Sequence, residues 1–121
     1  MEESAPFKQG GGNMVFEING IEWELIFVNP NNNRLQRSDG SWTIGMCDNS
    51  DKSISINNRL NDYMTDKCLA HELCHAFCFS YDIHMSIQEE EFLADWVSRY
   101  GRDLITILDD LMYIVLKNRA A

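Results

Sequence analysis

Ala70-His71-Glu72-Leu73-Cys74-His75-Ala76 is the stretch of this chain that constrains its fold most tightly. Because His71 and His75 are four residues apart, a helix places them one turn apart on the same face. Two neutral imidazoles so placed can occupy two corners of a tetrahedral zinc site. Glu72 projects about 100° further round the helix, where it can accept a proton from a metal-bound water. The stretch therefore predicts a helix that carries the H-E-x-x-H half of a metal site.

The helical pattern extends from about residue 62 to about residue 80. Leu69 and Leu73 supply apolar packing beside the histidines, as a helix on a core requires. Asn61, Asp62 and Thr65 are all suitable N-cap residues, so three starts are compatible with the sequence.

Two further helices are expected downstream. The first begins at Ser86 or Ile87 and ends at Tyr100, because Gly101 is a favourable residue just beyond a helix end. The second spans residues 103–118 and repeats apolar residues at three-and-four spacing, which is typical of a helix packed on a core. That stripe consists of Leu104, Leu108, Leu111, Met112 and Val115.

Strand patterns fill the first half of the chain. Asn19-Gly20 separates two β-prone runs, residues 14–18 and 21–28, and predicts a hairpin with a type I′ turn. Residues 42–47 and 53–57 are two more short strands between turn residues. Their short connections favour antiparallel pairing. The sequence thus predicts an α+β fold with a small, mostly antiparallel sheet of three or four strands.

Length and charge limit the function classes. With 121 residues the chain is expected to form one domain, residues 14–121, after a flexible tail of residues 1–13 that ends near three consecutive glycines. The net charge of −9 argues against a nucleic-acid-binding surface. Every apolar stretch is too short to cross a bilayer, and no secretory signal is recognisable, so a cytoplasmic protein is expected. The sequence carries no signal of oligomeric state.

The four cysteines, Cys47, Cys68, Cys74 and Cys78, are enough for two disulfides in an extracellular module. Cys74, however, lies inside the histidine motif. In a reducing cytosol such residues behave as small buried apolar side chains, so free thiols are expected.

A catalytic zinc site needs a third protein ligand besides the two histidines. In a metzincin a glycine and a third histidine would stand where this chain has Cys78 and Tyr81, which excludes that class. A gluzincin takes a glutamate from a following helix instead. Here Glu89, Glu90 and Glu91 open that helix, and the helical register has to select among them.

Glu91 is the preferred third ligand because Asp95 lies four residues further on, on the same helix face. An aspartate there can accept the free N–H of a ligating histidine. Ala94 is small and lets the two helices approach closely. Glu90, one position out of register, is the alternative ligand, whereas Glu89 is expected to be solvated at the helix start.

Two other side chains are candidates for a role at the site. His84 and Tyr81 could each stabilise a developing oxyanion. His84 lies in a loop after the first helix and is expected to be exposed.

The chain resembles the small ImmA/IrrE-type metallopeptidases, minimal gluzincins that include phage- and mobile-element-encoded members. The resemblance rests on residues 45–48, 53–56, 69–75 and 90–95, and covers about residues 21–100. Its specific part is H-E-x-x-H followed by E-x-x-x-D.

The resemblance implies a zincin-type pair of helices that carry the zinc ligands His71, His75 and Glu91. Glu72 would be the general base, and Asp95 would orient His71 from outside the ligand set. The substrate would be a protein or peptide, in known members a repressor protein, and residues 53–57 would form the sheet edge beside the cleft.

Two features depart from this family. Its members usually begin with a helix, whereas this chain is predicted to begin with a hairpin. Larger members also carry a helix-turn-helix or regulatory domain, for which 121 residues leave no room. The alternative function is a non-catalytic, zinc-containing module that binds another protein.

Overall fold

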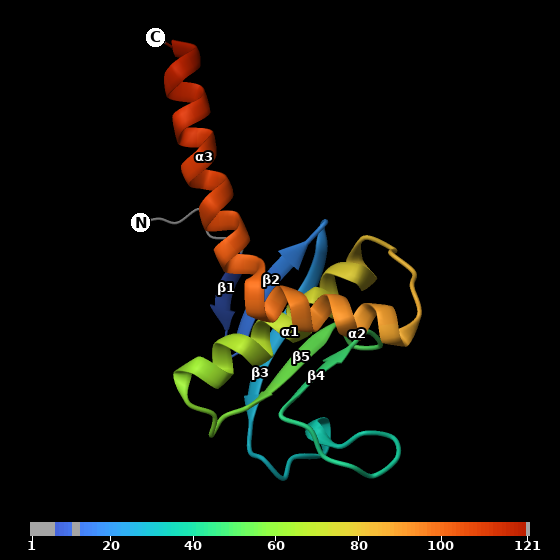
Figure 1. Ribbon diagram of the computed structural model, residues 1–121. Helices are drawn as coiled ribbons and strands as arrows, with labels where there is room; N and C mark the ends of the chain where they lie inside the picture. The colour runs from blue at the N-terminus through green and yellow to red at the C-terminus, as the bar shows by residue number, and fades with distance from the viewer. Residues whose placement is uncertain (1–6, 11–12, 121) are drawn as a thin grey trace.

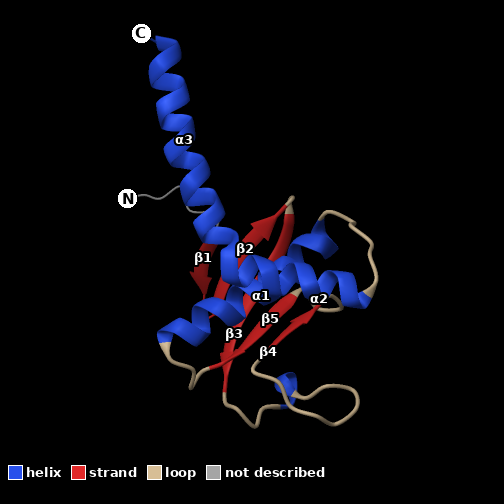
Figure 2. Cartoon of the chain, viewed as in Figure 1, coloured by secondary structure: helices blue, strands red, loops and turns tan. Residues whose placement is uncertain are grey.

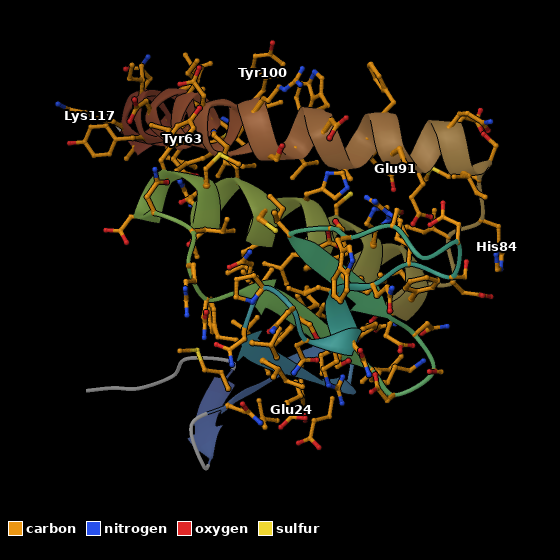
Figure 3. All side chains as sticks on the ribbon, turned by 90° about the horizontal axis from the view of Figure 1, so that it is seen from below. Glu24, Tyr63, His84, Glu91, Tyr100 and Lys117 are labelled. Atoms are coloured by element: carbon orange, nitrogen blue, oxygen red, sulfur yellow. The ribbon has the colours of Figure 1, made fainter. Side chains whose placement is uncertain are left out.

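The structure, a computed structural model, describes residues 7–10 and 13–120 and has an α+β fold (Figure 1). Its strands form one sheet in the order β1-β2-β3-β5-β4. Two helical layers follow, with α1 on the sheet and α2 on α1 (Figures 2 and 3). The strands are β1 (Phe7–Gly10), β2 (Asn13–Ile18), β3 (Ile21–Val28), β4 (Gly45–Asp48) and β5 (Ser53–Asn57).

The predicted α+β class is confirmed, but the sheet is mixed. β3 and β5 are parallel, whereas β1–β2, β2–β3 and β4–β5 are antiparallel. The parallel pair arises because the strand that follows β3 in the chain, β4, does not pair with β3. The chain passes through the loop that contains η1 (Asn33–Leu35), where Leu35 is fully buried, and reaches the far edge of the sheet as β4.

The expectation that residues 53–57 form the sheet edge is wrong. β5 lies between β3 and β4, and β4 is the edge strand. Ser53, Ile54, Ser55 and Ile56 are all buried, as in a strand that has neighbours on both sides and is covered by other layers. β4 therefore borders the helices at the edge of the sheet.

The Asn19-Gly20 hairpin forms as predicted and is tied to α1 (Asp62–Ser80). Both turn residues have positive φ, 52° and 77°, as a type I′ turn requires. The Asn19 side chain donates to the carbonyl of Ser80 over 3.1 Å, and the buried Trp23 indole donates to the Ser80 hydroxyl over 2.7 Å. These contacts fix the C-terminal end of α1 against the sheet.

At its other end, α1 is capped by Asn61, whose side chain accepts the N–H of Met64 over 2.8 Å. The structure thus selects one of the three possible N-caps. The inner face of α1 contributes Cys68 and Ala76 to a core that includes Trp23, Ile54 and Ile56. Packing on this core holds the histidine-bearing helix in place.

The prediction that Gly101 ends the second helix is wrong. α2 (Ile87–Trp96) continues through a π-helical turn, η2 (Val97–Gly101), into α3 (Arg102–Ala120). A glycine ends a helix when it adopts positive φ, but Gly101 is not among the positive-φ residues, and Arg102 has right-handed helical angles. The chain therefore stays helical beyond Gly101, with a change of direction at η2 (Figure 1).

The prediction that residues 103–118 pack on the core is also wrong. None of the described residues of α3 is buried, and the helix projects away from the sheet (Figure 1). The chain stays helical through Gly101, but the helix axis bends at the π-helical turn η2, so that α3 leaves at an angle to α2 and away from the layer formed by α1 (Figure 1).

Part of the segment expected to be a flexible tail is a strand. β1 pairs with β2 in the register Phe7↔Phe16 to Gly10↔Asn13. Residues 1–6 and 11–12 of the expected tail lie outside the described residues. Within the described part of the chain, no helix has both the length and the apolarity needed to cross a membrane.

Candidate metal centre

The first turn of α2 positions the acidic residues. The Ser86 hydroxyl accepts the N–H of Glu89 over 3.1 Å, and the Glu89 carboxylate accepts the N–H of Ser86 over 2.9 Å. This reciprocal capping box starts the helix, so that Glu90 and Glu91 follow on the turn that approaches α1. Glu89 therefore has a local structural role, which the Ser86-x-x-Glu89 spacing could have indicated.

His71, His75 and Glu91 come together as three candidate metal ligands. Nε2 of His71 lies 3.1 Å from Oε1 of Glu91, and Nε2 of His75 lies 2.9 Å from Oε2 of the same residue. The two Nε2 atoms are 3.2 Å apart. Ligands of a tetrahedral zinc, at 2.0–2.1 Å from the ion, are about 3.3 Å from one another, so these atoms are close to the required spacing.

The other nitrogen of each histidine faces a carboxylate. Nδ1 of His71 lies 3.0 Å from Oδ1 of Asp95, and Nδ1 of His75 lies 2.5 Å from Oε2 of Glu90. A carboxylate acceptor favours the tautomer with the proton on Nδ1, which leaves the Nε2 lone pair free for a metal. Both lone pairs then point to the position that Glu91 also faces.

Glu90 has a different place from the one expected of an alternative ligand. It contacts the outer nitrogen of His75 rather than the cluster of Nε2 atoms. Asp95 contacts His71, the histidine that the family resemblance assigned to it. The consecutive residues Glu90 and Glu91 thus both contact His75 on α1. Figure 3 shows Glu91 on the side of α2 that faces α1.

Glu72 is buried, with 9% of its surface exposed, and lines the same cleft as the two histidines. Burial raises the pKa of its carboxyl group, while the nearby His71 and His75 lower it. Glu91 raises this pKa further, and the backbone N–H of Cys47 lowers it by hydrogen bonding. A buried carboxylate that lies beside the ligand cluster and lines the same cleft is well placed to exchange protons there.

The cleft has a volume of about 660 Å³ and lies between β4 and the helices. β4 and the residues before it form one wall, and α1 with the α2–η2 rod forms the other. Three basic side chains line it despite the net charge of −9: Arg37, Lys67 and Arg99. Lys67 donates to the Ser98 carbonyl over 2.9 Å, which ties α1 to η2.

Gly45 allows β4 to approach α1. A Cβ atom at this position would lie 2.4 Å from Sγ of Cys68 and 3.2 Å from Cγ of Glu72. Only a glycine fits this contact without displacement of its neighbours. Sequence reasoning did not identify Gly45 as a site residue, although a glycine inside a strand pattern often marks such a close approach.

His84 and Tyr81 are not brought to the cluster. His84 pairs with Asp82 over 2.8 Å, and both side chains are largely exposed in the loop that Figure 3 shows beyond α1. Tyr81 stacks on Phe77 with ring centroids 5.9 Å apart. Neither residue lines the cleft, so the geometry gives no support to an oxyanion role for either.

The four cysteines are free thiols. Cys68, Cys74 and Cys78 are buried, and burial raises the pKa of each thiol, that of Cys74 to about 11. They pack as small apolar side chains, as expected from the sequence.

In comparisons with known proteins, no family model matches the chain, and neither a curated protein nor a solved structure matches it significantly.

Proposed function

We propose that this protein is a zinc-dependent peptidase of the gluzincin type, with His71, His75 and Glu91 as metal ligands. The observation that carries the proposal is the arrangement of the two imidazoles. Their Nε2 atoms converge with the Glu91 carboxylate, while Asp95 and Glu90 hold their Nδ1 atoms. Ligands oriented from behind by carboxylates are typical of zinc sites.

A bound zinc would acidify a water molecule and polarise the scissile carbonyl group. Glu72 takes the proton from the attacking water as its oxygen bonds to the carbonyl carbon. It then delivers that proton to the amide nitrogen as the C–N bond breaks, so its carboxylate is regenerated. Asp95 and Glu90 keep the two imidazoles in the ligating tautomer throughout.

Access to the ligand cluster favours a catalytic over a structural site. Structural zinc sites are closed by four protein ligands, whereas catalytic sites have three and keep one position open. Among the described residues this cluster has three members, it lines the cleft, and the Glu91 side chain is half exposed.

β4 offers a place for an extended peptide. The N–H of Asn57 bonds to the carbonyl of Ile44, so alternation along the antiparallel ladder turns the backbone groups of Gly45 and Cys47 away from β5. The Thr43 hydroxyl donates to the Gly45 carbonyl over 3.1 Å and the Cys47 N–H interacts with Glu72, so the Gly45 N–H and the Cys47 carbonyl are the groups proposed to pair with a peptide. An extended substrate can add to such an edge through backbone hydrogen bonds. The proposed substrate is therefore an unfolded or extended protein segment, as in the repressor cleavage that the family resemblance implies.

A second candidate function is a non-catalytic zinc module. One observation favours it: Ala94 is the only buried residue described in α2, so a metal could serve mainly to hold α2 on α1. The variant His71→Ala distinguishes the two functions, because loss of a structural zinc removes folding free energy outright. Unfolding of this variant supports the module, and a folded but inactive variant supports the peptidase.

The direct test of the peptidase uses Glu72→Gln, with denatured casein and a quenched fluorescent peptide library as probes. Wild type should cleave these probes only when zinc is present. Glu72→Gln should bind zinc but should cleave them at a rate at least about 100-fold lower. Glu89→Gln is the matched control, since it removes a neighbouring charge without touching the cluster, and it should keep wild-type activity. Full zinc-dependent activity in Glu72→Gln would contradict this mechanism.

A further inference from the structure

α3 presents a broad apolar surface that nothing in the described chain covers. The helix is 19 residues long, and its large apolar side chains are 37–68% exposed. Figure 1 shows it projecting beyond the sheet and α1. Monomeric proteins rarely expose contiguous apolar patches above a few hundred Å². An exposed apolar surface of this size therefore indicates an interaction site.

The apolar residues of α3 follow a heptad pattern. With Leu104 and Leu111 at d positions, Leu108 and Val115 fall at a positions. The flanking e and g positions are apolar as well, which widens the stripe beyond a simple a/d seam. They are occupied by Ile105, Ile107, Met112 and Ile114.

The opposite face of α3 does not suit a membrane surface. It carries Asp103, Thr106, Asp109 and Asp110 together with the exposed Tyr113 and Leu116, and Lys117 lies near the end of the helix. Helices that lie in membrane interfaces are rich in Lys and Arg on their polar face. An acidic face on a chain of net charge −9 instead favours a protein partner.

We propose that α3 pairs antiparallel with α3 of a second copy of this chain. In such a pair the a residues of one helix meet the d residues of the other. The same apolar stripe on each copy therefore forms both sides of a two-fold symmetric interface. Leu108 meets the second copy's Leu111, and Leu104 meets its Val115. Around them Ile105 faces Met112 and Ile107 faces Ile114, so every position in the seam is apolar on both sides.

The size and charge of the surface fit this arrangement. Eight aliphatic or thioether side chains from each copy, each 37–56% exposed, supply apolar area on the scale of a small specific interface, about 1,200 Å² in total. Along the helix axis, the antiparallel orientation brings Lys117 of each copy to the level of the second copy's Asp103. A parallel pair would set Lys117 at the level of Lys117 and Asp103 at the level of Asp103.

The first test measures the mass of the full chain by sedimentation over a range of concentrations. Wild type should be a dimer at micromolar concentration. Leu108→Glu/Leu111→Glu should raise the dimer dissociation constant about 100-fold or more, because it places charges in the seam. The matched control, Thr106→Glu/Tyr113→Glu, adds the same charge on the outer face and should remain dimeric.

The second test is the orientation of the pair. Oxidation of a mixture of Leu108→Cys and Leu111→Cys chains should cross-link them faster than either chain alone, with wild type as the control for the native thiols. Faster cross-linking of each chain with itself would indicate a parallel pair and overturn the proposed register.

Two other results would overturn the proposal. One is a monomeric wild type, whether or not it binds vesicles of neutral and anionic phospholipid. The other is a dimer that Leu108→Glu/Leu111→Glu leaves intact. The inference does not depend on the peptidase proposal, since zinc content and mass are measured separately.

Discussion

At the scale of single residues, Glu90 and Asp95 should control zinc affinity without binding the ion. Glu90 is hydrogen-bonded to Nδ1 of His75, and Oδ1 of Asp95 lies 3.0 Å from Nδ1 of His71. Replacement by the neutral amide, Glu90→Gln or Asp95→Asn, should weaken zinc binding about 10–100-fold, because the imidazole becomes less basic and less firmly oriented. Competition with a chromophoric chelator measures this, with Glu89→Gln as the control. Unchanged affinity in both variants would contradict the proposed role.

The buried thiols predict a loss of stability at alkaline pH. Burial raises the pKa of Cys74 to about 11 and that of Cys68 to about 12, above the value of 9.0 for an exposed thiol. The folded state thus holds these protons more tightly than the unfolded state. The resulting stability is complete below about pH 9 and is lost as the pH rises towards 11–12.

Two measurements check this prediction. The urea midpoint should fall between about pH 8.5 and about pH 10.5. Near pH 8, the native thiols should react with an aromatic disulfide reagent far more slowly than the thiols of the unfolded chain. Equal reaction rates in the two states would show that the thiols are accessible.

The sequence predicted the positions that share a helix face. His71 with His75, and Glu91 with Asp95, are each one turn apart, and the structure brings these four residues together. The contact of Glu90 could not be predicted, because it depends on how α2 crosses α1, which helical periodicity does not encode. Gly45 was missed for a similar reason: the close approach of β4 to Cys68 is a tertiary feature.

At the scale of elements, the contact of β4 with α1 is sensitive to a single methyl group. Gly45→Ala would place a Cβ 2.4 Å from Sγ of Cys68 and displace Glu72 or β4. The free energy of unfolding should drop by about 1–3 kcal/mol, as is usual for overpacking. Urea denaturation measures the change.

The control is a double-mutant cycle with Cys68→Ala, which removes the atom nearest to the added methyl group. If the clash is the cause, Gly45→Ala should cost less in the Cys68→Ala background than in wild type. Additive costs would place the cause elsewhere.

Strand order and helix ends were harder to predict than the elements themselves. The run Ser53–Ile56 alternates polar and apolar residues, as a strand with one solvent-exposed face does, and the short turn before it suggested simple antiparallel neighbours, yet all four residues are buried. Gly101 is compatible with both a helix end and a helix interior, and its conformation decides between them. Local sequence leaves both choices to long-range packing.

At the scale of the whole molecule, zinc should stabilise the fold by joining α1 to α2. A ligand that binds only the folded state at a free concentration about 100-fold above its Kd adds about 2.7 kcal/mol. Thermal unfolding of wild type should shift upward with zinc and downward with a chelator. Glu91→Ala should lose most of this zinc-dependent shift, and a shift of equal size in that variant would argue for binding elsewhere.

The zinc content of the purified protein, for wild type and Glu91→Ala side by side, tests the central claim most directly. Glu89→Gln serves as the control for a lost charge at the same helix start. About one zinc per chain in wild type and in the control, and far less in Glu91→Ala, is the predicted result. A wild type that holds no zinc even after zinc is added, or a Glu91→Ala variant that retains it in full, would contradict the proposed metal site.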